Sequence, residues 1–496
     1  MPVLIPAINP VLKKKHNTWK RVKTLIEYDE ESITEQFCIK LPNESQKSYE
    51  ARKQMYARGF VNPTIELLTG PCHTIFSKEI EVETNGAENR LYEFSQNCTM
   101  GMTDKTTLTR FMNEQVCPSI RGYGTVFVLV DMPKIENSKT SESYQKENRI
   151  WPYVCMVDPL SVINYEFLNG ELLWFAYRSN SRALWADPIG KQPDTRSEVR
   201  IWTKKQYLVI DEKTMQIDAQ KSFDNKWGFV PVLIQAQFKP SCDCILGEAP
   251  FFASSNYIIA ANDHYSTANI EVSKHSNLTL LLHQDAVIAA NMKLDEDSRA
   301  ITKTTQDGSL IWDGEQKPEY LTKDLDAVQK ANDRGDKYMS NAFDNEKSAK
   351  SVAKSGYDGS DVVKSGFAMV VERDPIMANI TATANDCEAL QNNIMLIADK
   401  IINNGRVTVD GGEYVKYDKE YELQPYVEFM SETEKFMQVA VSDTAKRERQ
   451  KKINTREITD SELRNKANDE VDMYDFGEMS LSDDELNKMV DSSIGE

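Results

Sequence analysis

Three lysines, Lys347, Lys350 and Lys354, recur at steps of three and four residues, and Lys364 follows beyond a glycine-containing stretch. On a helix this spacing places the first three ammonium groups on one face. Lysine is a compact point charge that contacts phosphate without distinguishing one base sequence from another. The group therefore predicts weak contact with a phosphate backbone. The alternative is a solvated lysine face beside a loop.

Other arrangements that could do chemistry are missing from the sequence. It has no G-x-x-x-x-G-K-[ST] phosphate loop, no H-E-x-x-H zinc helix and no G-x-S-x-G nucleophile elbow. Cys242 and Cys244 form the one close cysteine pair, and they lack the second pair of ligands that a structural zinc site needs. We therefore expect no enzyme activity, no cofactor and no metal. An unrecognised hydrolase with dispersed carboxylates is the alternative.

Composition predicts an acidic protein with a large core. Hydrophobic residues make up 40% of the 496 residues, and the formal net charge is −18. No run approaches the roughly 18 apolar residues of a membrane span, and the eight cysteines lie mostly alone in apolar runs, as reduced thiols do. We expect a protein of the cytoplasm, or one assembled from it. The negative charge opposes tight DNA binding, unless the carboxylates simply solvate the outer surface.

The elements that must position the lysines are helices. Helical spacing runs from Pro250 to about His275, and Thr322 can cap a second helix that reaches Phe343. Asp374 and Pro375 suit the start of a third helix, and Asn403-Asn404-Gly405 suits its end. Its apolar stripe is about 40 Å long at 1.5 Å per residue and needs a long partner. The stripe consists of Ile376, Ile380, Ala384, Cys387, Leu390, Ile394, Ile397 and Ile401.

Strand patterns surround this helical part. Leu278–Leu282 and Ser309–Trp312 predict a small α/β insert between the first two helices. The N-terminal half predicts an α/β block, with helices in Ser48–Ser77 broken at Asn62-Pro63 because a residue before proline avoids the helical region. The predicted strands of this block are 124–130, 153–157, 172–177, 199–202, 207–211 and 229–234.

Short segments along the chain resemble, in order, landmarks of the portal proteins of tailed bacteriophages. The resemblance covers about residues 45–465. KSGFAM at 364–369 resembles the segment that follows the portal tunnel loop. The landmarks that resemble the portal wing are YEAR at 49–52, FVNPT at 60–64, the stretch 70–76, GYG at 122–124, VLVDMP at 128–133, WPY at 151–153, DPLSVIN at 158–164 and GFVPV at 228–232.

The resemblance implies an α+β subunit of portal type, with an α/β wing, a helical stem, a small α/β clip and a mostly helical C-terminal region. Such subunits form a closed ring, usually of twelve copies, through one heterologous interface that repeats. The implied regions are 1–249 as the wing, 250–277 as the first stem helix, 278–320 as the clip, 321–345 as the second stem helix, 346–366 as the tunnel loop region, 367–467 as the long helix with the C-terminal wing or crown, and 468–496 as an acidic, largely flexible tail.

The function that the resemblance implies is mechanical. The ring would occupy one capsid vertex of the virion, after assembly in the host cytoplasm, and would let the double-stranded DNA genome enter and leave. Its partners would be the major capsid and scaffolding proteins, the terminase large subunit and the head–tail adaptor. Lys347, Lys350, Lys354 and Lys364 would face the DNA, and Trp312 would anchor a partner at the clip unless it is a core residue of that lobe. The rival is an acidic capsid-associated scaffold without a channel.

Two charged stretches near the C-terminus complete the predictions. Residues 468–496 carry ten acidic residues and one lysine, which favours disorder, although Ser482–Glu485 could cap a short amphipathic helix that binds a partner. A basic cluster precedes them and is typical of an exposed helix face or a contact between subunits. Its members are Lys446, Arg447, Arg449, Lys451, Lys452 and Arg456.

Overall fold

The structure is a computed structural model, and it combines helices with mostly antiparallel sheets, which confirms the α+β class. It forms two compact units, the first made of Met1–His73 with Glu83–Tyr414 and the second of Thr74–Val82 with Val415–Glu496. None of the described helices is both long and apolar enough to cross a membrane. The described residues are 5–40, 46–78, 80–84, 90–99, 106–133, 150–182, 195–239, 244–276, 281–283, 303–304, 310–312, 326–346, 366–403, 405–419, 443–457 and 461–473.

The chain begins with helices whose ends are set by local capping. Asn9 accepts a hydrogen bond from the Val11 amide at the start of the first helix, and Asp29 caps the second in the same way through Ser32. The break predicted at Asn62-Pro63 is confirmed, because one helix ends before it and the next begins after it. These helices are α1 (Pro10–Glu27), α2 (Glu30–Phe37), α3 (Gln46–Gly59) and α4 (Thr64–Phe76).

A run of short helices leads into the first sheet of the larger unit. Gly124 ends this run with φ of +72°, and a Cβ atom there would collide with the backbone carbonyl of Glu248, so only glycine fits. The sequence patterns did not predict these helices. They are α5 (Arg90–Gln96), α6 (Leu108–Phe111), a π-helical turn η1 (Met112–Val116) and α7 (Cys117–Tyr123).

Two antiparallel sheets form the body of the larger unit. The first has the order β10-β2-β3, and the second has the order β4-β5-β6-β7-β8, with β9 also paired to β7. Five of the six predicted strands are confirmed, the sixth begins at Val232 rather than Phe229, and β4, β8 and β9 were not predicted. The strands are β2 (Thr125–Asp131), β3 (Tyr153–Val157), β4 (Val162–Leu168), β5 (Glu171–Arg182), β6 (Thr195–Thr203), β7 (Gln206–Asp211), β8 (Gln216–Ile217), β9 (Phe223–Asp224) and β10 (Val232–Ala236).

Helix α1 joins the core of both sheets through one tryptophan. Trp19 is fully buried, donates its indole N–H to the Tyr123 carbonyl at 2.9 Å, and meets the Phe127 ring edge-on at 6.4 Å. Phe127 of β2 in turn packs against Phe175 of β5, with ring centroids 5.7 Å apart. Such aromatic pairs stabilise a core beyond the area that they bury. Helix α1 is therefore held rigidly on the α/β body.

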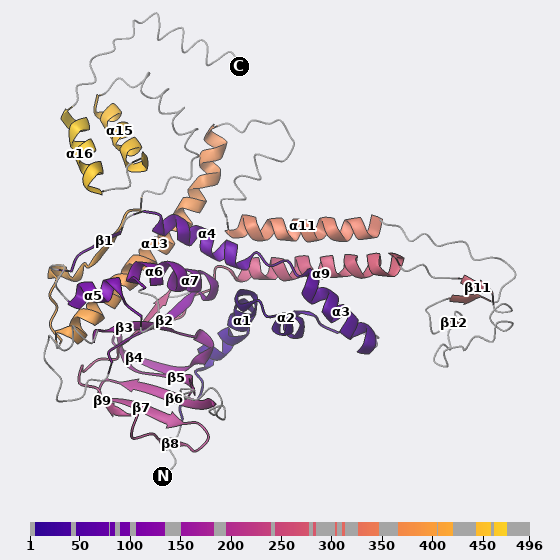
Figure 1. Cartoon of the computed structure of the whole chain (residues 1–496), viewed down its shortest axis with the longest axis horizontal. Helices are drawn as coiled ribbons and strands as arrows, with labels where there is room; N and C mark the ends of the chain where they lie inside the picture. Colours follow the sequence, from indigo (N-terminus) through magenta and orange to yellow (C-terminus); the bar gives the residue numbers. More distant parts are fainter. Residues whose placement is uncertain are drawn as a thin grey trace, which may run out of the picture. The chain divides into compact units, whose positions relative to one another are not determined.

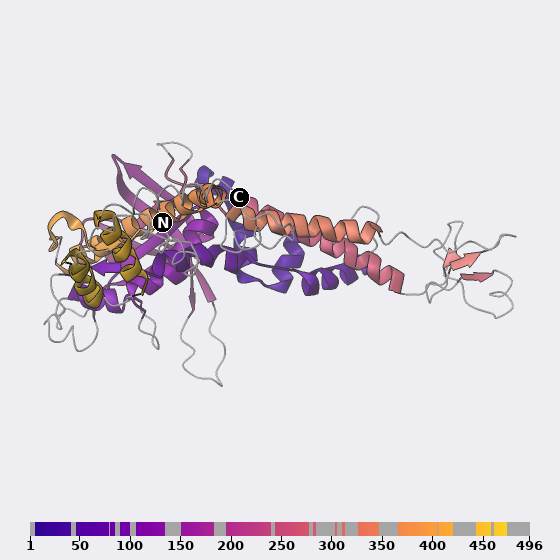
Figure 2. The same ribbon diagram turned by 90° about the horizontal axis from the view of Figure 1, so that it is seen from above.

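A long antiparallel helix pair leaves this body. Helices α9 (Phe252–Ser276) and α11 (Asp326–Glu346) lie side by side in both views (Figures 1 and 2), which confirms two of the predicted helices. The Tyr265 hydroxyl donates to Asp336 at 2.7 Å, and the Tyr338 ring stacks on His264 with centroids 5.5 Å apart. Gly335 lies directly under the Tyr265 ring, where an added Cβ would be 2.7 Å from the ring Cδ1. The absence of a side chain at Gly335 thus leaves the space that the Tyr265 ring occupies.

Replacement of Gly335 by alanine is expected to destabilise the helix pair. Alanine normally stabilises a helix by about 1 kcal/mol relative to glycine, but here the new methyl group forces the Tyr265 ring out of its place. In a Tyr265→Ala background the obstacle is gone, so the same change should become stabilising. The midpoint of urea unfolding for the four chains of this cycle measures the coupling. Equal effects in both backgrounds would show that the ring does not oppose the methyl group.

The insert between α9 and α11 contains a small sheet. Its strands are β11 (Leu281–His283), β12 (Lys303–Thr304) and β13 (Leu310–Trp312), in the order β11-β13-β12. Strand β13 pairs parallel to β11 and antiparallel to β12. The predicted strand at Ser309–Trp312 is confirmed from Leu310 on, and the one at Leu278–Leu282 overlaps β11.

The longest helix differs from its predicted start. Helix α13 (Gly366–Ile402) begins before Asp374 and Pro375, so both residues lie inside it and the predicted N-terminus is wrong. A proline inside a helix costs about 3 kcal/mol, and the burial of the stripe beyond it offsets that cost. Seven of the eight predicted stripe residues, from Ile380 to Ile401, are buried. The side chain of the eighth, Ile376, is not among those that the structure describes.

The partners of α13 are a sheet and the short helices α5 and α7, rather than one long helix. Gln235 of β10 donates to Asp386 at 3.1 Å, and Gln237 donates to Thr383 at 3.0 Å. At its end, the fully buried Asp399 accepts hydrogen bonds from Thr408 and from the Tyr414 hydroxyl, the latter at 2.7 Å. The predicted stop is confirmed at Gly405, which has φ of +90°.

The second unit contains a two-stranded sheet and two helices. Strand β1 (Ile80–Val82) pairs antiparallel with β14 (Val415–Tyr417), and α15 (Asp443–Glu457) packs against α16 (Ser461–Met473). Helix α16 includes residues 468–473, which the sequence assigned to the flexible tail. The amphipathic segment after Ser482 lies outside the described residues.

The basic cluster of the second unit lies on α15 and is not a uniformly exposed face. Lys446 is 6% exposed, and Lys451 forms an ion pair with Asp472 of α16 at 2.8 Å. A helix that packs a partner on one side must bury some of its charged residues with their carbon stems. The prediction of an exposed face is therefore wrong for Lys446, and contact between subunits stays a prediction.

Candidate functional site

The base of the α9–α11 pair contains a buried charged cluster. The Arg121 guanidinium of α7 pairs with the Glu346 carboxylate at 2.6 Å, and the Ser254 hydroxyl donates to the other carboxylate oxygen at 2.7 Å. The side chains of Arg121 and Glu346 are 1% and 2% exposed. Asn345 donates to Ser254 at 2.8 Å. Groups from three helices thus meet around one carboxylate.

The local backbone explains why these helices meet. Phe251, just before α9, donates its amide to the Arg121 carbonyl at 3.3 Å, so α9 starts where α7 ends. Glu346 is the last residue of α11, where the helix dipole disfavours a negative side chain. The positive charge of Arg121 offsets both the unfavourable helix dipole and the loss of hydration at the buried Glu346 carboxylate. The end of α11 is consequently fastened to the α/β body.

The lysines predicted to contact DNA follow this fastened end directly. Lys347, Lys350, Lys354 and Lys364 all lie between Glu346, where α11 ends, and Gly366, where α13 begins. They lie outside the described residues, so their contact with phosphate stays a prediction. The structure shows that the residue preceding this segment, Glu346, is anchored to the α/β body by its ion pair with Arg121.

The predicted partner anchor, Trp312, lies at the end of a strand. It is the last residue of β13, and its backbone is in register with His283 of β11. The position of its side chain is not among the described features. Partner binding and a place in the core of the insert therefore both stay open for Trp312.

Three buried thiols lie near the charged cluster. The thiol of Cys117 of α7 interacts with those of Cys72 of α4 and Cys387 of α13, and the Cys72 thiol donates to the Leu68 carbonyl at 3.1 Å. Burial raises the pKa of the Cys72 and Cys117 thiols well above the ordinary value. A thiol of raised pKa is a poor nucleophile, because the thiolate is the reactive form. The three thiols serve as packing where α4, α7 and α13 meet.

Alkylation should be slow at the buried thiols of the folded protein. Burial raises the pKa of Cys98 from 9.0 to about 12, which lowers the thiolate fraction near neutral pH about a thousandfold. Iodoacetamide labelling followed by peptide mass spectrometry is expected to show Cys98 reacting at least that much more slowly in the folded protein than in urea. Half-buried Cys244 is the internal comparison. Similar rates for Cys98 in both states would contradict its burial.

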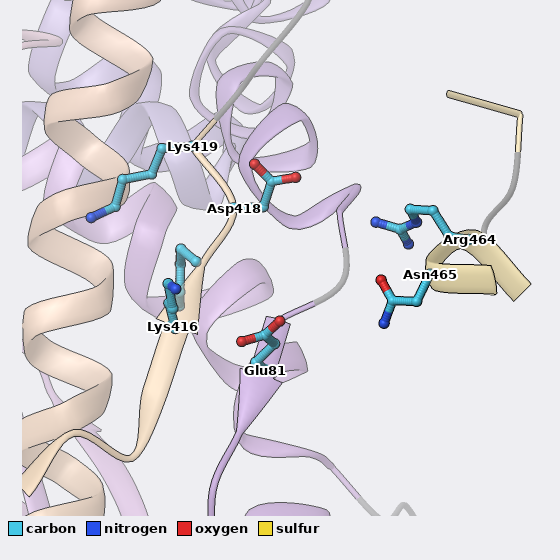
Figure 3. Close-up of a pocket in the computed structure, with 7 residues that line it drawn as sticks. Glu81, Lys416, Asp418, Lys419, Arg464 and Asn465 are labelled. Carbon is cyan, nitrogen blue, oxygen red and sulfur yellow. The ribbon is translucent and has the colours of Figure 1, made fainter. Parts of the chain in front are cut away.

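The second unit contains a polar pocket of about 480 Å³. In Figure 3, Arg464 and Asn465 of α16 point toward Asp418 and Glu81 of the strand region, while Lys419 extends the other way. Asp418 forms an ion pair with Lys78 at 2.9 Å. The pocket lining has no histidine or cysteine, and its charged residues are Glu81, Lys416, Asp418, Lys419 and Arg464.

The described residues contain no group of three or more His, Cys, Asp or Glu side chains that could hold a metal ion. The arrangement that the structure does bring together, Arg121 with Glu346 and Ser254, has every carboxylate oxygen engaged and buried. It fixes helices in place.

Comparison with known proteins finds no family model that matches this chain and no curated protein of significantly similar sequence.

Sequence reasoning missed Arg121, Glu346 and Ser254. Arg121 and Glu346 are 225 residues apart, and nothing local marks them as partners. One signal was present for Arg121, which is the one charged residue between Val116 and Val130. An arginine isolated in an apolar run needs a buried partner, so a distant carboxylate could have been expected.

Proposed function

We propose that this chain is the subunit of a portal-type ring that forms the DNA channel at one capsid vertex. The observation that carries the proposal is the α9–α11 pair. It is interrupted by a small sheet and fastened at its base to an α/β body, and it is followed by a lysine-containing segment and a long helix. This order of elements is the one that the portal resemblance implies. The sequence landmarks support the proposal independently.

Within this proposal the parts have mechanical roles. The α9–α11 pair would be the stem, the insert with β11–β13 would be the clip, and residues 347–365 would approach the DNA. The terminase and later the adaptor would dock at the clip, with Trp312 as a candidate anchor. The ring itself would be non-enzymatic, and the packaging motor would be a separate ATPase.

The rival proposal is an acidic capsid-associated scaffold without a channel. Particle mass distinguishes a closed ring from a small assembly. Twelve copies of the 56.6 kDa chain would make a particle of about 680 kDa. Mass photometry of the purified protein at micromolar concentration is expected to show one large, discrete species. Monomers and dimers alone, both from the purified chain and from virion extracts, would favour the scaffold.

A further inference from the structure

Helix α1 presents a basic face in a protein whose net charge is −18. Lys13, Lys14 and Lys20 are exposed and recur at helical spacing around Asn17. Other lysines of the same helix are engaged, since Lys15 pairs with Glu248 at 2.6 Å and Lys23 with Asp158 at 2.5 Å. The structure pairs Lys13, Lys14 and Lys20 with no acidic group in the part of the chain that it describes. Their charge therefore faces outward.

A hollow with both polar and apolar walls lies beside this basic face. It has a volume of about 520 Å³ between α1, the end of α2 and α9. Phe37, Ile39 and Ile259 contribute its apolar walls, and Lys20 and Arg21 lie on the α1 side. The uncharged polar residues of the lining are Asn17, Gln36 and Asn256. Ile39 is 76% exposed, an unusual exposure for an isoleucine, and it lies just beyond α2. Cations and an exposed aliphatic side chain thus border the same hollow, which we call the α1 groove.

The chemistry of the α1 groove selects a class of ligand. A nucleic-acid backbone would meet the lysines but has no apolar group to fill the space between Phe37, Ile39 and Ile259. The Asp263 carboxylate at the α9 wall disfavours any negative group inside the groove, so the acidic residues of a ligand have to lie on the α1 side, near the lysines. An amphipathic helix with acidic residues beside its apolar stripe satisfies both features at once. The apolar stripe fills the hollow, and the acidic residues meet Lys13, Lys14 and Lys20.

We propose that the α1 groove binds an acidic amphipathic helix of a partner protein. Helix-in-groove recognition of this kind places apolar anchors at every third or fourth position in the hollow. The rim lysines would set the orientation and the rate of association, and Ile39 would supply apolar contact. The inference goes beyond the channel function, and it stands on the described contacts whether or not the chain forms a ring.

The test uses the full chain and a labelled synthetic helix with leucines at every third or fourth position and glutamates on the flanks. Fluorescence anisotropy should show saturable binding that weakens as salt is raised. The Lys13→Glu, Lys14→Glu, Lys20→Glu triple variant should bind at least about tenfold more weakly, and Ile39→Ser should also weaken binding. The matched control reverses three exposed lysines elsewhere, Lys205, Lys213 and Lys226, and should stay within about twofold of the wild type.

Other outcomes would overturn the proposal. Equal loss in the control triple variant would mean that net charge alone, and not the α1 groove, governs binding. If a probe with glutamine in place of every glutamate binds equally well, the lysines do not contribute to recognition. Mixed-sequence duplex DNA that binds the face more tightly than the acidic helix would make it a nucleic-acid surface. If the α1 triple variant changes the particle mass and no acidic probe binds the wild type, the groove is an interface between copies of this chain.

Discussion

Replacement of Glu346 by alanine is expected to lower the free energy of unfolding by about 3–5 kcal/mol, the usual cost of removing one partner of a buried ion pair. The change leaves the Arg121 guanidinium 1% exposed with no carboxylate, and it leaves the Ser254 hydroxyl without its acceptor. It also releases the end of α11 from the α/β body. A Glu346→Gln variant keeps an acceptor for Ser254 and should be less severe.

A surface ion pair provides the matched control for this loss. Arg110 and Glu114 are four residues apart on a short helical stretch, at 2.8 Å, with side chains about half exposed. Glu114→Ala should cost less than about 1 kcal/mol, since solvent screens such pairs. Urea unfolding of the three variants and the wild type measures the difference. If Glu346→Ala is as mild as Glu114→Ala, the Arg121 cluster does not hold the helix pair in place.

Reversal of Lys347, Lys350 and Lys354 to glutamate is expected to leave ring yield intact and to reduce the packaged genome length strongly. Under the proposed function these residues follow the anchored Glu346 and lie closest to the DNA. The variant replaces three positive charges per subunit by three negative ones, a change of six charge units, and the new carboxylates would repel the phosphates. Charge reversal is more informative than alanine, because a merely solvated face tolerates both. The structure fixes only the start of this segment, so the experiment tests the residues directly.

The control for charge is again Lys205, Lys213 and Lys226, which are exposed on or beside the strands of the six-stranded sheet and its turns. Their reversal changes the net charge of the ring by the same amount and should leave packaging normal. Normal packaging by the Lys347, Lys350 and Lys354 variant would remove the DNA-facing role and leave the ring proposal standing. Loss of rings in that variant would instead point to a role of the lysines in assembly.

Periodicity predicted the elements whose apolar residues repeat without interruption. Helix α9, most of α11 and the strands β3 and β7 follow from spacing. Strand β2 follows from its continuous apolar run, because it is buried on both faces from Thr125 to Val130. The start of α13 could not be predicted in this way. Asp374 and Pro375 match a helix start, yet a long buried stripe can carry the helix through them.

Helix α1 shows a different limit of prediction. Its buried residues Leu12, Trp19, Val22 and Leu25 follow helical spacing, but the lysines among them mask the pattern in the sequence. Contacts between distant residues are beyond any local pattern, as the pairing of Arg121 with Glu346 shows. The Tyr265 ring likewise explains the presence of Gly335 inside α11, where a glycine ordinarily weakens a helix.

The central claim is that copies of this chain close into a ring around a channel. Negative-stain electron microscopy of the purified full-length protein, with particles viewed down their axis, tests it most directly. The account predicts closed rings with a central hole and one rotational symmetry, since a single heterologous interface repeats around the axis. Compact particles without a hole, or open chains of variable length, would contradict it.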